Sequence, residues 1–379
     1  MRSVKFGDVA SRLNIHVDQA TTLLEYYVGG EHIDSRSLLI QKRAPIKGST
    51  IGYQFQFGFR AGDILFMTKN PHLRKCSKVN FEGLCSIATF VIHSLDESIL
   101  LQDYLLLEMQ SDKFWDYCEA HKSGGVNYFI TWGTLSNYEF LLPPVKEQKT
   151  LVEKAWAAYN LKLAYQDMIV ATDELVKSQF IEMFGTYETT PVGEYVDCSF
   201  PGEWGSEDTD GTGIKVIRTT NFTNAGKLNL DDVVTRSIEE KKVNKKTIKK
   251  YDTILERSGG TNDNPVGRVV LFEEDGQFLC NNFTQILRFK DIDPRFAFYA
   301  LYFFYQTNKT AIRSMGRKTT GIQNLNMSKY LEIGIPNASE DEQKQFVSIT
   351  EQADKSKFEI KNSIEAIDKV INSLINENL

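Results

Sequence analysis

One pattern occurs twice in this sequence, and the repeat limits the possible folds more than any single motif does. Pro143 and Glu147-Gln148-Lys149 precede a long helix predicted over residues 151–184. In the second half, Pro336 and Glu342-Gln343-Lys344 precede another long predicted helix that runs to the C-terminus. A chain of 379 residues that repeats near its midpoint is expected to contain two copies of one unit.

Shorter matches between the two halves keep the same order along the chain, which strengthens the prediction of a duplication. The matched segments are Phe6-Gly7-Asp8-Val9 with Val192-Gly193-Glu194-Tyr195-Val196, Gly62-Asp63-Ile64-Leu65 with Tyr251-Asp252-Thr253-Ile254-Leu255, Leu84-Cys85 with Leu279-Cys280, Gly124 with Gly316, and Glu139–Pro143 with Glu332–Pro336.

Each copy is predicted to begin with a mixed α+β part of about 140 residues. Short β-branched and aromatic runs alternate there with turn residues, and an apolar helix follows late in each copy, over 101–109 and 296–305. Asp293-Pro294 suits the N-cap and first turn of the second of these helices. The predicted strands are 51–59, 63–67, 87–92, 216–218, 253–255, 266–272 and 285–289.

Each copy is predicted to end with a long helix that carries one apolar stripe. The stripes are Val152, Trp156, Tyr159, Leu163, Ile169, Val176, Phe180 and Phe184, with a phase slip near Met168, and Phe346, Ile349, Ala353, Ile360, Ile364, Ile367, Ile371 and Leu374. Spacings of three and four indicate coiled-coil packing, and such a helix is roughly 55 Å long. We expect an antiparallel pair that separates two mixed domains; in the alternative, each helix packs on its own domain.

Several function classes find no support in the residues. The sequence has no GxxxxGK[ST] loop, no GxGxxG after a strand and no Asn-Pro-Pro-aromatic motif of adenine methyltransferases. The five cysteines form no CxxC pair and the five histidines have no metal-ligand spacing, so neither a disulfide framework nor a metal site is expected. No apolar run or signal core indicates a membrane or secreted protein, and we expect a cytoplasmic one.

Charge is distributed unevenly along the chain, although the net charge is −6. Residues 35–81 contain nine Lys/Arg and one acidic residue, and residues 236–257 contain eight Lys/Arg and four acidic residues. The final segment, 340–379, instead has nine acidic residues and five lysines. Local fields control phosphate binding, so the basic stretches are candidate nucleic-acid surfaces.

Basic, polar and glycine residues in loops supply the candidate DNA contacts, since Lys and Arg meet phosphates and glycine permits close backbone approach. The alternative is that each basic segment is only a solvated loop or helix face. Over residues 241–250, pairs of lysines recur every four residues and would form one face of a helix. The candidates are Lys42, Arg43 and Lys47; Lys69, Arg74 and Lys75; Lys245, Lys246 and Lys249; Arg257, Ser258, Gly259, Gly260 and Arg268; Arg317, Lys318 and Thr320; and Arg218 with Asn221.

This arrangement resembles the specificity subunit of type I restriction-modification systems. The order of mixed domain, Pro…Glu-Gln-Lys and long helix, given twice, is similar to that family over essentially the whole chain. The segments 251–260, 266–269 and 320–326 resemble its second domain. The first copy departs from the pattern: residues 69–75 stand where the second copy has Ser-Gly-Gly, which fits two domains that recognise different sequences.

The resemblance implies four parts: a first target-recognition domain (1–145), a central spacer helix (146–185), a second target-recognition domain (186–338) and a C-terminal spacer helix (339–379). Each domain would recognise half of a bipartite asymmetric DNA site. The implied partners are two methylation subunits, which carry S-adenosylmethionine, and restriction subunits, which use ATP and Mg. The chain itself would hold no cofactor and no catalytic residue.

The helix stripes are the expected contacts with partner subunits, through Val152, Trp156, Tyr159, Leu163, Ile360, Ile364, Ile367, Ile371 and Leu374. Two other hypotheses stay open at this point. One is the recognition subunit of a related, type IIB-like restriction-modification enzyme that cuts on both sides of its site. The other is a coiled-coil scaffold with two ligand-binding domains and no DNA.

Overall fold

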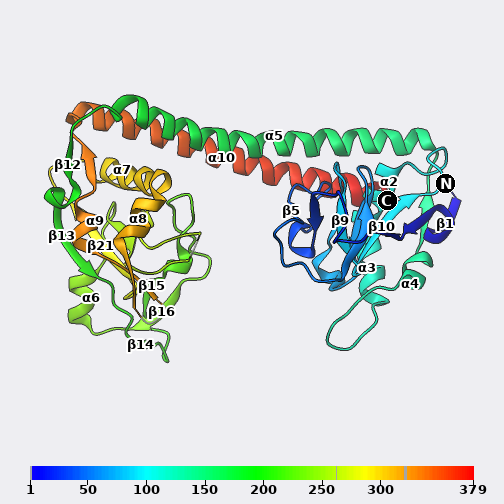
Figure 1. Cartoon of the computed structure of the whole chain (residues 1–379), viewed down its shortest axis with the longest axis horizontal. Helices are drawn as coiled ribbons and strands as arrows, with labels where there is room; N and C mark the ends of the chain where they lie inside the picture. The colour runs from blue at the N-terminus through cyan, green and yellow to red at the C-terminus, as the bar shows by residue number, and fades with distance from the viewer. Residues whose placement is uncertain (1, 262, 320–321) are drawn as a thin grey trace. The chain divides into compact units, whose positions relative to one another are not determined.

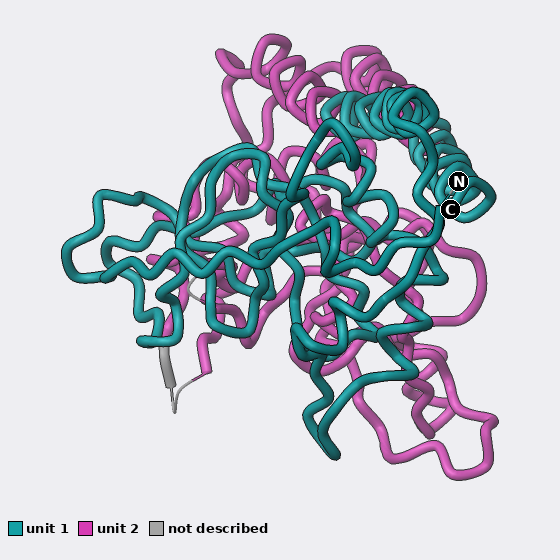
Figure 2. The backbone as a smooth tube through the Cα atoms, turned by 90° about the vertical axis from the view of Figure 1, so that its right-hand side faces the viewer, with its two compact units in different colours: residues 1–169, 359–379 teal, residues 170–358 magenta. Residues whose placement is uncertain are grey.

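The computed structural model describes residues 2–261, 263–319 and 322–379. The chain divides into two compact units (Figure 2): unit 1 comprises residues 1–169 and 359–379, and unit 2 comprises residues 170–358. Two long helices, α5 (Val145–Phe184) and α10 (Glu340–Asn378), contribute to both units (Figure 1). Each unit therefore combines a mixed part with one portion of each long helix.

The mixed part of unit 1 precedes α5 and consists of short strands with three helices late in its sequence. Its elements are β1 (Arg2–Lys5), α1 (Phe6–Val9), β2 (Ala10–Leu13), β3 (Ile15–His16), β4 (Tyr26–Val28), η1 (Gly30–His32), β5 (Ala44–Pro45), β6 (Phe55–Phe59), β7 (Ile64–Met67), η2 (Pro71–Leu73), β8 (Cys76–Lys78), β9 (Gly83–Ser86), β10 (Thr89–Ser94), α2 (Gln102–Gln110), α3 (Asp112–Ala120), α4 (Trp132–Ser136) and β11 (Glu139–Leu142).

The mixed part of unit 2 lies between α5 and α10 in sequence and has a similar composition of elements. They are β12 (Thr189–Pro191), η3 (Val192–Tyr195), β13 (Val196–Pro201), β14 (Ser206–Glu207), β15 (Ile214–Ile217), η4 (Thr219–Asn221), β16 (Val234–Ser237), α6 (Glu240–Lys246), β17 (Thr253–Glu256), β18 (Ser258–Gly259), β19 (Val269–Leu271), β20 (Phe278–Cys280), β21 (Thr284–Phe289), α7 (Pro294–Thr307), α8 (Lys309–Met315), β22 (Gly316–Thr319), β23 (Ile322–Leu325), α9 (Met327–Leu331) and β24 (Gly334–Pro336).

The same strand order occurs in both units. Unit 1 has the pair β1-β11 and the antiparallel sheet β2-β10-β7-β8, and unit 2 has the pair β12-β24 and the antiparallel sheet β13-β21-β17-β19. A further sheet in each unit contains one parallel pair, β4 with β9 and β15 with β20. The units differ at the edges of this sheet, which is β3-β6-β9-β4-β5 in unit 1 and β14-β16-β15-β20 in unit 2.

Large aromatic side chains fill the core of each unit. In unit 1, Phe66 stacks on Trp115 with ring centroids 5.5 Å apart, and both side chains are fully buried. In unit 2, Phe180 of α5 contacts Phe346 of α10 and Phe303 of α7, in each case at 5.2 Å between centroids. Burial of an aromatic side chain removes some of the largest apolar areas from water, so these clusters stabilise each unit.

The predicted helices and most of the predicted strands are present, with shifted ends. Asp293 caps α7 by accepting a hydrogen bond from Arg295 N (2.8 Å), and Pro294 is its first residue, as predicted. The strand predicted over 51–59 begins only at Phe55, because the preceding residues form a turn in which Phe55 N donates to Gly52 O (3.1 Å). The strand predicted over 266–272 is shorter, at Val269–Leu271, and follows Gly267 in the left-handed region (φ 108°).

The glutamine of each Glu-Gln-Lys triplet is buried and joins the start of a long helix to the mixed part of its unit. Gln148 accepts a hydrogen bond from Leu101 N (2.9 Å) and donates to Ile99 O (2.8 Å) and Pro143 O (2.9 Å). Leu101 is the residue just before α2. The side-chain amide thus satisfies a donor at the start of one helix and holds the loop that leads into another.

Gln343 makes the equivalent contacts in unit 2. It accepts a hydrogen bond from the backbone N–H of Asp293 (2.9 Å), the N-cap residue of α7, and donates to Ala338 O (2.9 Å). The neighbouring Glu342 completes a capping box, because its carboxylate accepts from Ser339 N (2.8 Å) and Ser339 Oγ (2.7 Å). The repeated triplet is therefore the junction between mixed part and long helix in both units.

Within each unit, the portions of the two long helices pack against each other and against the mixed part. In unit 2, Asp173 Oδ1 pairs with Lys357 Nζ (2.7 Å) while Phe180 contacts Phe346, so these portions run antiparallel. In unit 1, Lys162 Nζ pairs with Asp368 Oδ1 (2.6 Å). Among the described residues, no helix combines the length and the apolar character required to cross a membrane.

Replacing the junction glutamines tests their structural role. We expect Gln148→Leu to lower the free energy of unfolding by about 3 kcal/mol, because three backbone groups, one of them buried and two partly buried, lose their partner. Gln343→Leu, which removes two such bonds, is expected to cost about 2 kcal/mol. Urea unfolding followed by circular dichroism measures both. The control Gln166→Leu changes an exposed glutamine of α5 and is expected to stay within about 0.5 kcal/mol of the unmodified chain; equal effects at all three positions contradict the prediction.

Candidate nucleic-acid interface

In unit 2, the structure brings two of the predicted DNA-contact segments together. β18, which contains Ser258 and Gly259, pairs with β23, and β23 pairs with β22, which contains Arg317. Gly259 and Gly260 both have positive φ (109° and 67°), and a Cβ at Gly260 would lie 2.7 Å from Val266 N. Glycine is thus required there, and the exposed Arg317 extends from the neighbouring hairpin.

Two predicted contacts in unit 2, Ser258 and Asn221, are buried, and a third, Arg218, is partly buried. Ser258 is 5% exposed, and its hydroxyl donates to Asn324 Oδ1 (2.7 Å). Asn221 is 4% exposed; it accepts from Arg218 N (2.8 Å) and donates to Asn229 O and Asp232 O. Arg218 donates to the carboxylate of Asp232 (2.8 Å). The internal hydrogen bonds of these side chains order the loops around them.

Arg268 and Arg257 have different surroundings, although both were predicted to face DNA. Arg268 Nε donates to Glu256 Oε2 (2.6 Å), whose side chain is 3% exposed, and Arg268 Nη2 donates to Thr219 O (3.3 Å). A buried carboxylate requires such a partner, so Arg268 stabilises the loop after β18. Arg257 is half-buried and donates weakly to Gln285 Oε1 (3.3 Å).

The lysine run does not form one helical face, and this prediction is wrong. Helix α6 ends at Lys246, so Lys249 lies beyond it. The reason is Ile248, which is 2% exposed and whose N–H donates to Phe278 O (3.0 Å), so the chain leaves the helix to place this side chain in the core. Lys245 and Lys249 are exposed, while Lys246 pairs with Glu203 (2.9 Å).

In unit 1, the first basic segment is exposed and the second is largely bound internally. Lys42 pairs with Asp34 (2.6 Å), the Arg43 guanidinium lies 4.0 Å from the Tyr26 ring centroid, and Lys47 is exposed. In the second segment, Arg74 donates to the Asp112 carboxylate and Lys75 donates to Gly30 O (2.5 Å).

Lys69 is the exposed member of that second segment. Lys69 forms a β-bridge with Phe129. Phe129 in turn forms a bridge with Ser123, which closes a hairpin between these two residues. Unit 1 therefore pairs this segment with a hairpin, as unit 2 pairs β18 with the hairpin β22-β23. Two further predicted contacts give no information: Thr320 lies outside the described residues, and only the backbone of Lys318 is described, within β22.

The predicted partner-contact stripe packs largely within the chain itself, where two of its nine residues are buried and seven are partly buried. Tyr159 and Ile371 are 3% and 6% exposed in the core of unit 1, and the Tyr159 hydroxyl lies 2.7 Å from Ser37 Oγ. The other members are partly buried, five of them directly against this core. These are Val152, Trp156, Leu163, Ile367 and Leu374, with Ile360 and Ile364 also half-buried on α10.

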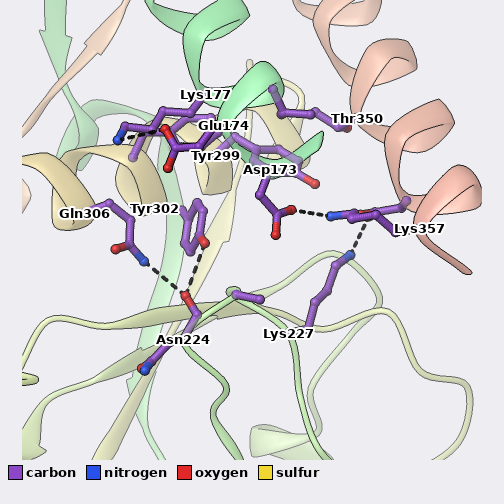
Figure 3. A pocket seen from close by; sticks show the side chains of 14 residues that line it. Asp173, Glu174, Lys177, Asn224, Lys227, Tyr299, Tyr302, Gln306, Thr350 and Lys357 are labelled. Carbon is purple, nitrogen blue, oxygen red and sulfur yellow. Dashed lines mark hydrogen bonds and ion pairs between the residues drawn. The ribbon is translucent and has the colours of Figure 1, made fainter. Parts of the chain in front are cut away.

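Unit 2 also contains a cavity of about 320 Å³ between α5, α7, α10 and the loop after η4 (Figure 3). A chain of alternating charges crosses it: Glu273 pairs with Lys227 (2.6 Å), Lys227 with Asp354 (2.9 Å), Asp354 with Lys357 (2.9 Å), and Lys357 with Asp173 (2.7 Å). The pairs connect the mixed part to both long helices within unit 2.

The charges in this cavity stabilise each other against the cost of burial. Burial disfavours the ionised form of Asp354, but the charge of Lys227 and hydrogen bonds from Lys227 and Lys357 outweigh it and lower the pKa of Asp354. Burial likewise disfavours the charged form of Lys227, yet its surroundings, including Asp354 and Glu273, raise the pKa of Lys227. Every charge in this series of ion pairs has a partner. We therefore interpret the series, which we call the charged brace, as a structural link between the mixed part and the long helices of unit 2.

Comparisons with known proteins agree with the geometry of unit 2. Residues 199–368 match the family model described as the type I restriction modification DNA specificity domain. The resemblance expected from the sequence is therefore confirmed, and this stretch of the chain carries that domain. It covers the β18-β23-β22 sheet, the exposed Arg317 and most of α10.

The chain is similar to one curated relative and to solved structures. It is 25% identical over 178 residues to the type I restriction enzyme EcoDI specificity subunit of Escherichia coli; the match covers 45% of this chain and 35% of the length of that subunit. A chain in a structure of a type I restriction-modification system has a TM-score of 0.58 and 18% identity, with 99% of this chain and 96% of that chain covered.

A second solved structure has the same fold. It is the type I restriction-modification S subunit of M. genitalium, with a TM-score of 0.51, 12% identity, and coverage of 99% of this chain and 94% of that chain. At these identities the likeness establishes the fold alone.

The charged brace predicts a pH-dependent loss of stability in Asp354→Asn. A carboxylate whose pKa is lowered in the folded state stabilises the fold above its unfolded pKa, and the contribution disappears as pH falls through the folded pKa. We expect Asp354→Asn to lower the free energy of unfolding by about 1–3 kcal/mol at pH 7. The difference from the unmodified chain should shrink below about pH 4.

Urea unfolding at several pH values measures this difference. Glu365→Gln, which changes an exposed carboxylate in the middle of α10, serves as the control and is expected to have little effect at any pH. A loss in Asp354→Asn that is the same at pH 3.5 and pH 7 contradicts the role of the ionised carboxylate.

Proposed function

We propose that the protein is a DNA-sequence specificity subunit of a type I restriction-modification complex, in which each unit recognises one half of a bipartite asymmetric site. The family-model match over residues 199–368 carries the proposal. The shared strand order extends it to unit 1, since a mixed part with the same central sheet suits the same task. The divergent edges of the two sheets fit two different half-sites.

The proposed parts are those expected from the sequence: recognition domains at 1–145 and 186–338, and spacer helices at 146–185 and 339–379. The fold supports this division, because α5 and α10 have 40 and 39 residues and are far longer than either unit requires for its own core. In this proposal, the paired helices set the distance between the two half-sites. An internal duplication accounts for the repeated junction glutamines.

The chain would supply recognition, and its partners would supply catalysis. Two methylation subunits would bring S-adenosylmethionine and the adenine-modifying site, and restriction subunits would bring the ATP- and Mg-dependent steps. No cofactor is assigned to this chain. In this scheme the complex, rather than the chain alone, modifies or cleaves DNA.

We place partner docking on exposed apolar residues of the long helices instead of the stripe, which packs largely within the chain. Leu161 and Leu175 of α5 are 47% and 63% exposed and lie fourteen residues apart, which corresponds to two heptads on one helix face. Phe358 of α10 is 61% exposed. Large apolar side chains in such positions are typical of helix-helix interfaces between subunits.

Expression of the chain with its methylation subunit in a host without other adenine methylation tests the proposed function. Sequencing that detects modified adenines is expected to find one motif, split into two defined halves by a gap of unspecified bases. The same host with the methylation subunit alone is the control and should show no such motif. A single continuous motif, or the same motif without this chain, would rule out the proposal.

A matched lengthening of both spacer helices tests the role of the gap. Because α5 and α10 share cores within each unit, four residues are inserted after Ile169 and four after Phe358. One helical turn adds about 6 Å, and one base pair spans about 3.4 Å, so the gap should grow by about one or two base pairs.

The bases of both halves should stay the same in this variant, as judged by the methylated motif. Insertion into α5 alone is the comparison, and it should reduce the yield of folded protein because it shifts one helix against the other. Changed bases with an unchanged gap contradict the spacer role.

A further inference from the structure

Two neighbouring loops of unit 1 each cross from one side of β9 to the other in the β3-β6-β9-β4-β5 sheet. One loop (17–25) connects β3 to β4, and the other (46–54) connects β5 to β6. Backbone hydrogen bonds join them at both ends: Val17 N donates to Gln56 O (2.9 Å), and Ile46 N donates to Glu25 O (2.8 Å). We call this pair of loops the crossing loops.

A side chain also holds the crossing loops together near the end at β3 and β6. Gln19 Nε2 donates to Gly52 O (2.9 Å) and Phe55 O (2.5 Å). This amide fixes the turn that precedes β6 and aligns it with the chain after β3. The loops are thus a built surface with defined geometry, held by side-chain as well as backbone bonds.

The crossing loops and the strands beside them enclose an open groove of about 700 Å³. Polar and aromatic side chains line it, among them His16, Gln19, Tyr53 and Gln56. Tyr53 is 85% exposed, although it is a large aromatic residue, and Leu23 on the partner loop is 97% exposed. Such exposure on ordered loops is typical of contact surfaces rather than of packing.

Among the described residues, the groove lining is mainly uncharged and polar or apolar, with one acidic residue and no Lys or Arg. Its acidic lining residue, Asp18, already accepts hydrogen bonds from Ala20 N (2.9 Å) and Thr21 Oγ1 (3.2 Å). The crossing loops also carry the exposed Lys47, and the exposed Arg43 precedes them, stacked on Tyr26. Arg43 and Lys47 flank β5, at the other end of the crossing loops from the groove, and can meet phosphates, while the uncharged polar groups of the groove can contact base edges.

Among the described residues, the strands that border this groove have no counterparts in unit 2. The groove lies against β3 and β6, two strands that pair on one side of β9. In unit 2, the corresponding strand β20 is at the edge of its sheet, and β14 extends the opposite side. A surface present in one unit and lacking a counterpart strand pair in the other is suited to make the two half-sites different.

We propose that this groove contacts the bases of the half-site recognised by unit 1, with Gln56 facing base edges and Tyr53 packing beside them; the inference rests on the proposed function. Glutamine can donate to and accept from adenine in the major groove, which makes Gln56 a direct determinant of sequence. The basic segment at 69–75 is less suited to this task, because Arg74 and Lys75 already have internal partners.

The test uses the chain assembled with its methylation subunit and a DNA library randomised across both half-sites. In the Tyr53→Ala/Gln56→Ala variant, we expect discrimination at one or two base pairs of one half to fall by on the order of tenfold, with the other half unchanged. The single variant Tyr53→Ala, at an exposed position, should show a smaller effect in the same half. Thermal unfolding confirms that each variant is folded.

Two further variants complete the design. Gln166→Ala, at an exposed glutamine of α5, should leave both halves unchanged, and Arg317→Ala, on the β22 hairpin of unit 2, should weaken binding without altering the half affected by Tyr53. If the unmodified complex selects a split site and the double variant selects the same bases with the same discrimination, the groove is not the contact surface. If the unmodified complex selects no split site, the proposed function fails and this inference fails with it.

Discussion

The structure depends on two buried glutamine amides. A primary amide is small, carries both a donor and an acceptor, and needs no counter-charge when it is buried. Gln148 and Gln343 use this property in the same way: each accepts from the backbone N–H at the start of an apolar helix and donates to the loop before a long helix. A carboxylate could not donate and an aliphatic side chain could do neither, so the junction explains why this residue recurs in both halves.

Both units keep one internal frame and differ at their edges. Shared junctions and central antiparallel sheets leave little freedom in the core, because a change in strand order would move many buried side chains. Edge strands are less constrained: β3 and β6 in unit 1, or β14 in unit 2, can be gained or lost without disturbing the central sheet. A protein whose two halves must recognise different sequences can therefore vary at these edges and retain its cores.

Sequence patterns predicted the elements well and the environments of single charges poorly. The repeat, both apolar helices with the Asp293 cap and both long helices follow from local periodicity and cap chemistry. The partners of basic residues do not, since Arg74 binds Asp112, 38 positions away, and the loop residue Lys227 binds Asp354 of α10. The prediction that the lysine run forms one helical face failed for a similar reason, because burial of Ile248 in the core outweighed the helical spacing of the lysines.

Basic residues that have internal partners differ from exposed basic residues, which are the candidate DNA contacts. Arg268 pairs with the buried Glu256 carboxylate, so it cannot turn to a phosphate without leaving a buried charge unpaired. Arg74 pairs with the half-exposed Asp112 carboxylate. Lys47, Lys69, Lys245, Lys249 and Arg317 are exposed and can neutralise phosphates at little cost to the fold. These exposed basic residues occur in both units, so in the proposed role each unit can attract the phosphate backbone of its own half-site. In the proposed role, base choice then depends on uncharged groups, such as Gln56 and Tyr53 of unit 1, because charges attract every DNA sequence alike.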